Sequence, residues 1–370
     1  MDRRHLLGLL ATCAGAAALT PARAAQGRYR ARPVVAGLEH PWSLAFLPDG
    51  RALVTERAGR LRLIEAGRLV AAPVAGVPEV AATGQGGLLD VLPDPAFAGN
   101  GILYLSYAGA TPQGAATHLL RARLVGDRLT DAQVILVGGA GRTSRHFGSR
   151  LAFDGEGLLH VSLGDRGEMA RAQDLADLAG KIARITTDGG VPPDNPFVGR
   201  EGARPEIYAF GVRNPQGLAR NPWTGVIWEQ EHGPRGGDEV NVLRAGANYG
   251  WPVVTHGVDY SLLPIGEGRE KPGIEPPRHV WVPSIAPSGM AFYDAAIFPD
   301  WRGSLFVGAL KDELLVRLEL DGERVVREER LLEGEIGRIR DVRVGPDGYV
   351  YLLNDETEGG LWRLEPSKAS

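Results

Sequence analysis

Residues 211–241 concentrate the residue types that bind and transform small molecules. The pairs Arg213-Asn214 and Glu231-His232, together with a Gly-Pro turn, flank a short apolar run that is typical of a strand. Because binding residues gather in loops at the ends of strands, this pattern favours a ligand site. An ordinary solvated hairpin is the alternative interpretation.

Other polar loops carry cations and amides. Gln85 lies in a glycine-rich loop, where its amide can both donate and accept hydrogen bonds. Arg338 and Arg340 are two residues apart, so in a strand both side chains point to the same face. Together with Lys311 and Arg213 they predict a cationic pocket for a ligand that carries carboxylates or phosphates. Strand-edge salt bridges are the alternative for each cation taken singly.

His146 is the candidate for proton transfer. The pKa of an unperturbed histidine is about 6.5, which suits a base at working pH, although an isolated histidine is more often structural. The sequence contains no P-loop, no dinucleotide-binding glycine unit, no serine-hydrolase elbow and no zinc-binding HExxH helix. Nucleotide cofactors and serine-hydrolase chemistry are therefore not expected.

A repeated phrase positions these loops: an apolar strand, a turn with Asp, Asn, Gly or Pro, and a second apolar strand. Six copies begin near residues 43, 92, 151, 218, 290 and 342. Each copy is a β-hairpin signal, and the uneven spacing of roughly 45 to 80 residues matches propeller blades with loops. The sequence thus predicts an all-β fold, a six-bladed β-propeller, with a β-sandwich plus a second domain as the alternative. Helical periodicity is confined to residues 170–181.

The N-terminus indicates export. Arg3 and Arg4 form a basic start, residues 6–19 are apolar, and Ala22-Arg23-Ala24 fits a cleavage site. The apolar run is shorter than the roughly 20 residues that span a bilayer. We predict a signal peptide over residues 1–24, through the Sec or the twin-arginine route, with a membrane anchor as the alternative. Residues 25–370 would then form one catalytic domain in the periplasm or outside the cell.

Composition limits the function further. The chain is 44% hydrophobic and 23% charged, an ordinary globular balance. Its formal net charge is −4 and it has no long basic run, which argues against nucleic-acid binding. No second apolar segment could span a membrane. The single cysteine, Cys13, lies in the predicted signal, so the mature protein would depend on its core or on bound metal rather than on disulfides.

In this order, the polar loops resemble those of the soluble aldose sugar dehydrogenases that use pyrroloquinoline quinone, relatives of soluble glucose dehydrogenase. The resemblance covers residues 38–343 and rests on GQGGLLDV, FGVRNPQG, EHGPRGGDEVN, ANYGWP, SGMAFY and GALKD. It implies a six-bladed propeller that oxidises the anomeric carbon of aldose mono- or disaccharides to lactones. The electron acceptor is not identified by the sequence.

The resemblance also implies roles for individual residues. His146 would take the proton from the anomeric hydroxyl, and Arg213 would stabilise negative charge on the quinone oxygen. The residues implied to bind the cofactor are Gln85, Arg213, Asn214, Tyr260, Ser284, Lys311, Arg338 and Arg340. Pyrroloquinoline quinone carries three carboxylates, which suit the cations in this set.

Two calcium ions are implied by the same resemblance. The carbonyls of Gly233 and Pro234 would bind an ion that also holds the quinone and acts as a Lewis acid. Glu239 and the Tyr249 carbonyl would bind a second, structural ion, with Asp259 as a further candidate ligand. Ligation by oxygen alone suits Ca²⁺.

The chain departs from glucose dehydrogenase in two respects. Arg145 stands directly before His146, where glucose dehydrogenase has an acidic residue, so the orientation of the imidazole is left open. The loops are also shorter, which predicts a more open site and a broader choice of sugar. The alternative functions are a non-catalytic propeller that binds a sugar or a protein, and a lactonase-like propeller. The latter would need carboxylates where this chain has cations.

Overall fold

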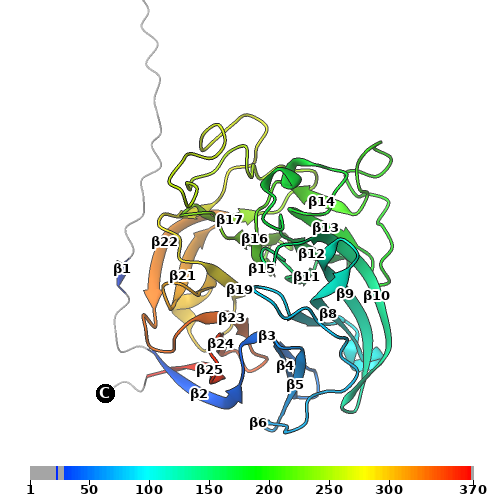
Figure 1. Ribbon diagram of the computed structural model, residues 1–370. Helices are drawn as coiled ribbons and strands as arrows, with labels where there is room; N and C mark the ends of the chain where they lie inside the picture. Colours follow the sequence, from blue (N-terminus) through cyan, green and yellow to red (C-terminus); the bar gives the residue numbers. More distant parts are fainter. Residues whose placement is uncertain (1–21, 24–28, 368–370) are drawn as a thin grey trace, which may run out of the picture.

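The structure, a computed structural model, describes residues 22–23 and 29–367 and consists almost entirely of β-sheet (Figure 1). Six antiparallel sheets are arranged around a central axis, and the fifth carries an additional short strand, β1 (Ala22–Arg23). The predicted six-bladed β-propeller is therefore confirmed. Apart from β1, the predicted signal peptide lies outside the described residues.

The first three blades follow one another along the chain. Blade 1 contains β3 (Pro41–Phe46), β4 (Ala52–Glu56), β5 (Arg60–Glu65) and β6 (Arg68–Leu69). Blade 2 contains β7 (Leu88–Pro93), β8 (Ile102–Thr111), β9 (Gly114–Val125) and β10 (Arg128–Gly141), with the short helix α1 (Phe97–Asn100). Blade 3 contains β11 (Leu151–Phe153), β12 (Leu159–Leu163), β13 (Lys181–Ile185) and β14 (Ile207–Phe210).

The last three blades complete the ring. Blade 4 contains β15 (Pro215–Arg220), β16 (Ile227–Glu231), β17 (Asp238–Val242) and β18 (His279–Trp281). Blade 5 contains β19 (Pro287–Tyr293), β20 (Ser304–Ala309), β21 (Leu314–Asp321) and β22 (Arg324–Leu331), with the 3₁₀ turn η2 (Pro299–Trp301). Blade 6 contains β23 (Ile339–Val344), β24 (Val350–Asn354), β25 (Gly359–Pro366) and, from the other end of the chain, β2 (Tyr29–Leu38).

Each of the six repeated phrases forms the hairpin between the first and second strands of a blade. In blade 1, for example, β3 and β4 pair from Pro41 opposite Glu56 to Phe46 opposite Ala52, around a turn at Gly50 with φ of 87°. In blade 6, β23 and β24 pair around a turn at Gly348 with φ of 81°. Glycine adopts such angles without steric cost, which is why these turns are readable in the sequence.

Apolar layers between neighbouring blades hold the ring together. Leu53 of blade 1 packs in one cluster with Leu105 of blade 2, and equivalent clusters lie at the other interfaces. The final interface joins Leu361 of blade 6 to Val54 of blade 1. Burying one such side chain contributes roughly 1.5–3 kcal/mol. The blades therefore form a rigid support for the loops that carry the polar residues.

The helix predicted over residues 170–181 is wrong. Only a 3₁₀ turn, η1 (Met169–Gln173), is present, and Lys181 already begins β13. The side chains of Asp174 and Asp177 accept hydrogen bonds from the backbone two residues further on, which competes with helical hydrogen bonding. Among the described residues, no helix is both long and apolar enough to cross a membrane.

Candidate active site

A cavity of about 270 Å³ lies where the inner strands and their loops converge, and all six blades contribute to its wall. This volume is near the lower end of the range for small-molecule sites. Its lining residues are Trp42, Arg57, Gln85, Leu89, Phe147, Gly148, Gln216, His232, Ala286, Leu310, Arg338, Arg340 and Asp355. Of the predicted cofactor-binding residues, Gln85, Arg338 and Arg340 line this cavity.

Three guanidinium groups and one carboxylate give one side of the cavity an excess of positive charge. Arg340 donates to Asp355 (2.7 Å) and to the Gln216 side chain (3.3 Å), and Arg338 donates to the Leu310 carbonyl (3.1 Å). The Nε atoms of Arg57 and Arg340 are buried and have no hydrogen-bond partner among the described residues. Donors left free in this way suit an anionic ligand.

The charge state of Asp355 follows from its neighbours. Burial by itself would raise the pKa of this carboxyl group, but Arg340, His40 and Arg57 together hold the pKa well below its usual range. His40 Nδ1 lies 2.9 Å from Asp355 Oδ1. Asp355 is therefore ionised and keeps Arg340 in place, with Arg338 Nη2 farther away at 3.9 Å, so one carboxylate faces three guanidinium groups.

His146 is fixed by a buried carboxylate that sequence reasoning missed. Its Nδ1 lies 2.6 Å from Asp165 Oδ1, and Asp165 Oδ2 accepts a hydrogen bond from the Trp251 indole at 2.8 Å. The backbone amide of His146 donates to the Gln85 side chain at 2.7 Å. Asp165 therefore sets the orientation of the His146 imidazole, which the sequence had left open because Arg145 replaces the acidic residue of glucose dehydrogenase. In the sequence, His146 directly precedes Phe147 and Gly148, two residues that line the cavity.

The electrostatics favour a neutral imidazole. Burial lowers the pKa of His146, and the positive charges of Arg213 and Arg145 lower it further, against the opposing effect of Asp165. The pKa of Asp165 is also lowered: burial alone would raise it, but His146, the Gly167 amide and Arg213 together outweigh that effect. An ionised Asp165 can only accept, so Nδ1 carries the proton and Nε2 has a free lone pair. This arrangement can accept a proton from a substrate hydroxyl.

Arg213 and Asn214 lie beside this pair. Arg213 Nη1 donates to the carbonyls of Gly233 (2.7 Å) and His232 (3.1 Å), and its guanidinium carbon lies 5.3 Å from the Trp251 ring centre. The Asn214 side-chain oxygen accepts from the Gly148 amide at 3.2 Å. The Gly233 carbonyl, an implied calcium ligand, therefore faces a cation in this structure.

The implied structural calcium site coincides with a buried acidic cluster. Glu229 and Glu231 on β16 pair across the strands with Asn241 and Glu239 on β17, and we call these four residues the acidic ladder. No Lys or Arg of the described chain forms an ion pair with its carboxylates. Burial raises the pKa of all three glutamates, and a neighbouring carboxylate raises each further: Glu239 for Glu229, Glu229 and Glu239 for Glu231, and Asp238 for Glu239. Glu229 Oε2 and Asn241 Oδ1 are buried without a hydrogen-bond partner among the described residues.

Unpaired oxygens of this kind suit a hard cation. Within the described ranges, no three His, Cys, Asp or Glu side chains converge closely enough to hold a metal ion by themselves. An ion at Glu239 would therefore need further oxygen ligands, and the Tyr249 carbonyl remains the predicted one. Asp259 is placed elsewhere, since its carboxylate bonds the backbone and hydroxyl of Ser261 on an exposed loop.

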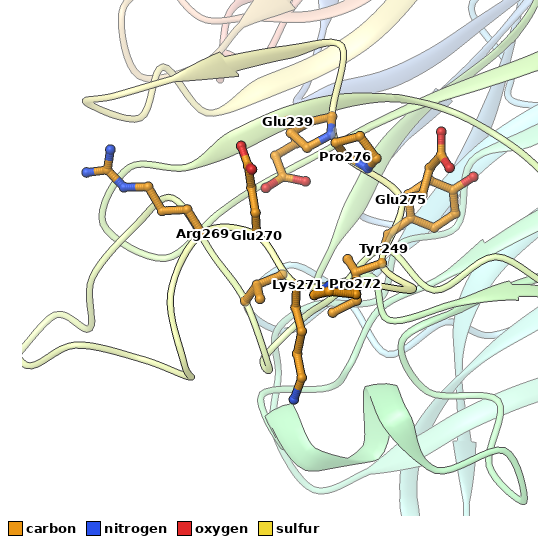
Figure 2. Close-up of a pocket in the computed structure, with 11 residues that line it drawn as sticks. Glu239, Tyr249, Arg269, Glu270, Lys271, Pro272, Glu275 and Pro276 are labelled. Carbon is orange, nitrogen blue, oxygen red and sulfur yellow. The ribbon is translucent and has the colours of Figure 1, made fainter. Parts of the chain in front are cut away.

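A second cavity, of about 440 Å³, opens beside the acidic ladder, between Glu239, Tyr249 and residues 269–277 (Figure 2). Figure 2 shows the carboxylates of Glu239 and Glu270 turned toward the same region, whereas the charged ends of Arg269 and Lys271 extend away from it. Glu239, which is 8% exposed, thus belongs both to the acidic ladder and to the wall of this cavity.

Five predicted cofactor-binding residues do not line the catalytic cavity: Arg213 and Asn214, described above, and Tyr260, Ser284 and Lys311. Tyr260 is 65% exposed, on the long connection between β17 and β18. Ser284 donates to Asp238 at 2.7 Å because that buried carboxylate needs donors. Lys311 is largely exposed and pairs with Asp312 at 2.8 Å. Their roles toward a cofactor stay predictions.

Four residues that complete the site were missed: Trp42, Arg57, Asp165 and Asp355. Three of them directly follow the second strand of a blade or lie within two residues of its end. The six-fold repeat predicts that these positions all meet at the same end of the ring. A search for polar residues just after each second strand would therefore have found Arg57, Asp165 and Asp355, but not Trp42, which lies in β3.

A closed propeller with a cationic cavity beside a neutral histidine–carboxylate pair is the architecture of a catalytic propeller that binds an anionic cofactor. The chain belongs to the glucose/sorbosone dehydrogenase family, whose model matches residues 38–363.

Individual relatives agree with this assignment. The aldose sugar dehydrogenase YliI of Escherichia coli strain K12 is 47% identical over 336 residues, covering 89% of this chain and 91% of the relative. A solved glucose dehydrogenase is 51% identical, with a TM-score of 0.89 over 92% of this chain and all of the other. The PQQ-bound aldose sugar dehydrogenase of Streptomyces coelicolor is 30% identical, with a TM-score of 0.77 over 93% of this chain and all of the other.

Proposed function

We propose that the protein is an exported aldose sugar dehydrogenase that uses pyrroloquinoline quinone and calcium. The main support is the cationic excess of Arg57, Arg338 and Arg340 over Asp355 in a cavity adjoining the neutral His146. The names of the relatives, one of them solved with PQQ bound, support the same conclusion.

The residues of this chain account for binding and proton transfer. Arg338, Arg340 and Arg57 would pair with the carboxylates of the cofactor, and Gln85 would hydrogen-bond its edge. Bound pyrroloquinoline quinone supplies a two-electron acceptor for the hydride that leaves the anomeric carbon. His146 Nε2 takes the proton of the anomeric hydroxyl, so that the sugar loses one hydrogen from carbon and one from oxygen and becomes a lactone. Asp165 holds the imidazole and stabilises the imidazolium that forms.

The calcium ions and the localisation belong to the proposal as well. The acidic ladder supplies oxygens for the structural ion through Glu239, and the Gly233 and Pro234 carbonyls would bind the ion at the cofactor. Export rests on the basic start, the short apolar run and the small-residue cleavage site of residues 1–24. N-terminal sequencing of the periplasmic protein tests this cleavage, and an intact Met1 would contradict it.

Reconstitution tests the activity. Purified protein with pyrroloquinoline quinone and Ca²⁺ should bind the quinone in a calorimetric titration and reduce a dye when an aldose is added. His146→Ala should bind the quinone nearly as well and lose roughly two to four orders of magnitude in turnover, the usual contribution of a positioned base. Quinone binding without turnover in the parent protein would instead favour a non-catalytic binding propeller.

A further inference from the structure

Two aromatic rings in the wall of the catalytic cavity are each backed by a buried arginine. Trp42, Leu89 and Phe147 line the cavity and pack in a single apolar cluster. The guanidinium carbon of Arg150 lies 4.1 Å from the Trp42 ring centre, and that of Arg166 lies 3.4 Å from the Phe147 ring centre. The rings line the cavity and the arginines do not, so both cations lie behind the wall.

The charge of Arg150 is balanced. Its Nη1 lies 3.0 Å from Asp341 and 3.4 Å from Asp90, and Arg343 pairs with the same two carboxylates. Two cations and two anions therefore cancel in this group. Seen from the cavity, Arg150 contributes packing against Trp42 and little net field.

The charge of Arg166 is not balanced in this way. Its guanidinium donates to the backbone carbonyls of Arg145, Thr143 and Ala115, and among the described residues no carboxylate forms an ion pair with it. The neighbouring Asp165 bonds His146 and Trp251 instead.

The remaining charged neighbours do not change this conclusion. Glu168 lies 3.5 Å from Arg171 and is more than half exposed. Burial lowers the pKa of Arg166 to about 10, with a further contribution from Arg171 and opposing ones from Asp165 and Glu168. Arg166 is therefore still protonated at neutral pH, and it places a fixed positive charge directly behind Phe147.

We propose that Arg166, acting through the Phe147 ring, is a positioning residue that stabilises negative charge on a planar ligand in the cavity. A charge that is fixed before the ligand arrives stabilises developing charge without reorganisation, and its effect is strongest where water is excluded. This inference rests on the proposed function and deepens it: the two-electron-reduced, more negative form of the cofactor is stabilised more than the oxidised form.

The midpoint potential of the bound quinone tests this without any sugar turnover. Protein loaded with pyrroloquinoline quinone and Ca²⁺ is titrated spectroelectrochemically as the parent and as Arg166→Gln. The variant should lose about tenfold in affinity for the reduced form relative to the oxidised form, which moves a two-electron midpoint by about 30 mV to more negative values. Arg166→Lys keeps the charge and should restore most of the shift.

Arg200→Gln is the matched control. Arg200 lies 5.5 Å over the Phe197 ring, away from the cavity wall, so the same loss of charge and cation–π contact should leave the midpoint unchanged. If Arg166→Gln does not fold, the pair Thr143→Asp and Thr143→Asn decides the question, because the Arg166 guanidinium donates to the Thr143 carbonyl and residue 143 is therefore in contact with this cation. The aspartate variant alone should shift the midpoint to more negative values.

The outcomes separate this inference from the proposed function. A parent protein that binds no quinone contradicts the proposed function itself. A parent protein that binds quinone, with the same midpoint in Arg166→Gln or in both Thr143 variants, overturns the role of Arg166 and leaves the proposed function standing. A merely structural role would lower the melting temperature and weaken both redox forms equally.

Discussion

Two groups of buried charges lie within the blades of this propeller, and they differ in their balance of charge. The first, which we call the axial network, joins Asp90, Arg150, Asp341 and Arg343 from blades 2, 3 and 6. The second is the acidic ladder of blade 4. The axial network carries equal numbers of cations and anions, whereas the ladder carries three carboxylates and no cation among the described residues.

The axial network is complete within the polypeptide. Asp341 also accepts from the Leu44 amide (2.9 Å) and Asp90 from the Leu151 amide (2.7 Å), so each carboxylate ties together neighbouring blades. Almost all of its hydrogen-bonding capacity is used by the chain itself. Such a group needs nothing from solution, and its role is to hold the inner strands in register.

The acidic ladder is incomplete within the polypeptide. Its carboxylates must either bind protons, as their raised pKa values indicate, or bind a cation from solution. Burial alone therefore does not tell a structural charge cluster from a ligand-binding one. The balance of charge does, and the following predictions test that distinction.

The largest effect is expected in the axial network. Asp341→Asn leaves Arg150 and Arg343 with one remaining carboxylate in a buried site, and should lower the free energy of unfolding by about 3–5 kcal/mol. Chemical denaturation measures this loss. Asp321→Asn removes an exposed partner of Arg324 and serves as the control, with an expected change within about 0.5 kcal/mol. Equal effects of the two substitutions would contradict the structural role of the network.

Calcium should act on the ladder by mass action. At a free Ca²⁺ concentration one hundred times its Kd, binding to the folded protein adds about 2.7 kcal/mol of stability, so chelation should lower the melting temperature as well as the activity. Glu239→Gln should make the melting temperature insensitive to Ca²⁺. Glu267→Gln, at an exposed position, should keep the dependence. If chelation leaves the melting temperature of the parent protein unchanged, the acidic ladder does not bind a metal ion.

The cationic wall of the cavity is the counterpart of the ladder, with an excess of the opposite charge. Arg338→Ala should weaken quinone binding by about 1.5–3 kcal/mol, since it removes a charge-assisted bond to a carboxylate. Lys311→Ala should have the smaller effect of the two, because Lys311 is largely exposed and paired with Asp312. Titration of the apoprotein measures both affinities, with Arg324→Ala as the control. If the affinity for the quinone is unchanged in both variants, the cationic wall of the cavity binds a different ligand.

The smallest effect concerns the pair His146 and Asp165, whose charges are coupled to proton transfer. Burial lowers the pKa of His146, so the unfolded chain binds a proton below about pH 6.5 before the folded protein does. This contribution to stability is present above pH 6.5 and is lost as the pH falls toward the folded pKa, by at most about 1.4 kcal/mol per pH unit. Asp165→Asn should lower the pKa of His146 further. The acid limb of kcat/KM would then move to lower pH, and an unmoved limb would contradict the coupling.

The fold was readable because each blade repeats the same local pattern. Apolar strands around glycine-containing turns, such as those at Gly50 and Gly348, predict the hairpin between the first two strands of each blade. The site was readable only in part. Gln85 and Arg338 stand in polar loops next to glycines, and Arg340 follows two residues later on β23, whereas Asp165 and Asp355 are single residues after a strand, and their partners come from elsewhere in the chain.

The remaining site residues could not be predicted because buried groups compete for the same hydrogen-bond donors. Ser284 was expected near the cofactor, but the buried Asp238 carboxylate draws its hydroxyl away. No local pattern reveals such a choice, because it depends on which donors the fold brings to a buried charge. For the same reason, the sequence pointed to Glu239 as a metal ligand without indicating that Glu229 and Glu231 lie beside it.

The pairing of β2 with β25 has a consequence for how the protein is made. Tyr29 lies opposite Pro366 and Leu38 opposite Gly359, so the first strand of the six blades to be synthesised pairs with the last. Until then β2 is a strand without a neighbour, and blade 6 lacks its outer edge. Contacts between such distant parts of a chain form slowly. Ring closure is therefore a late event in folding, and a chain that ends before β25 would leave β2 without a strand to pair with.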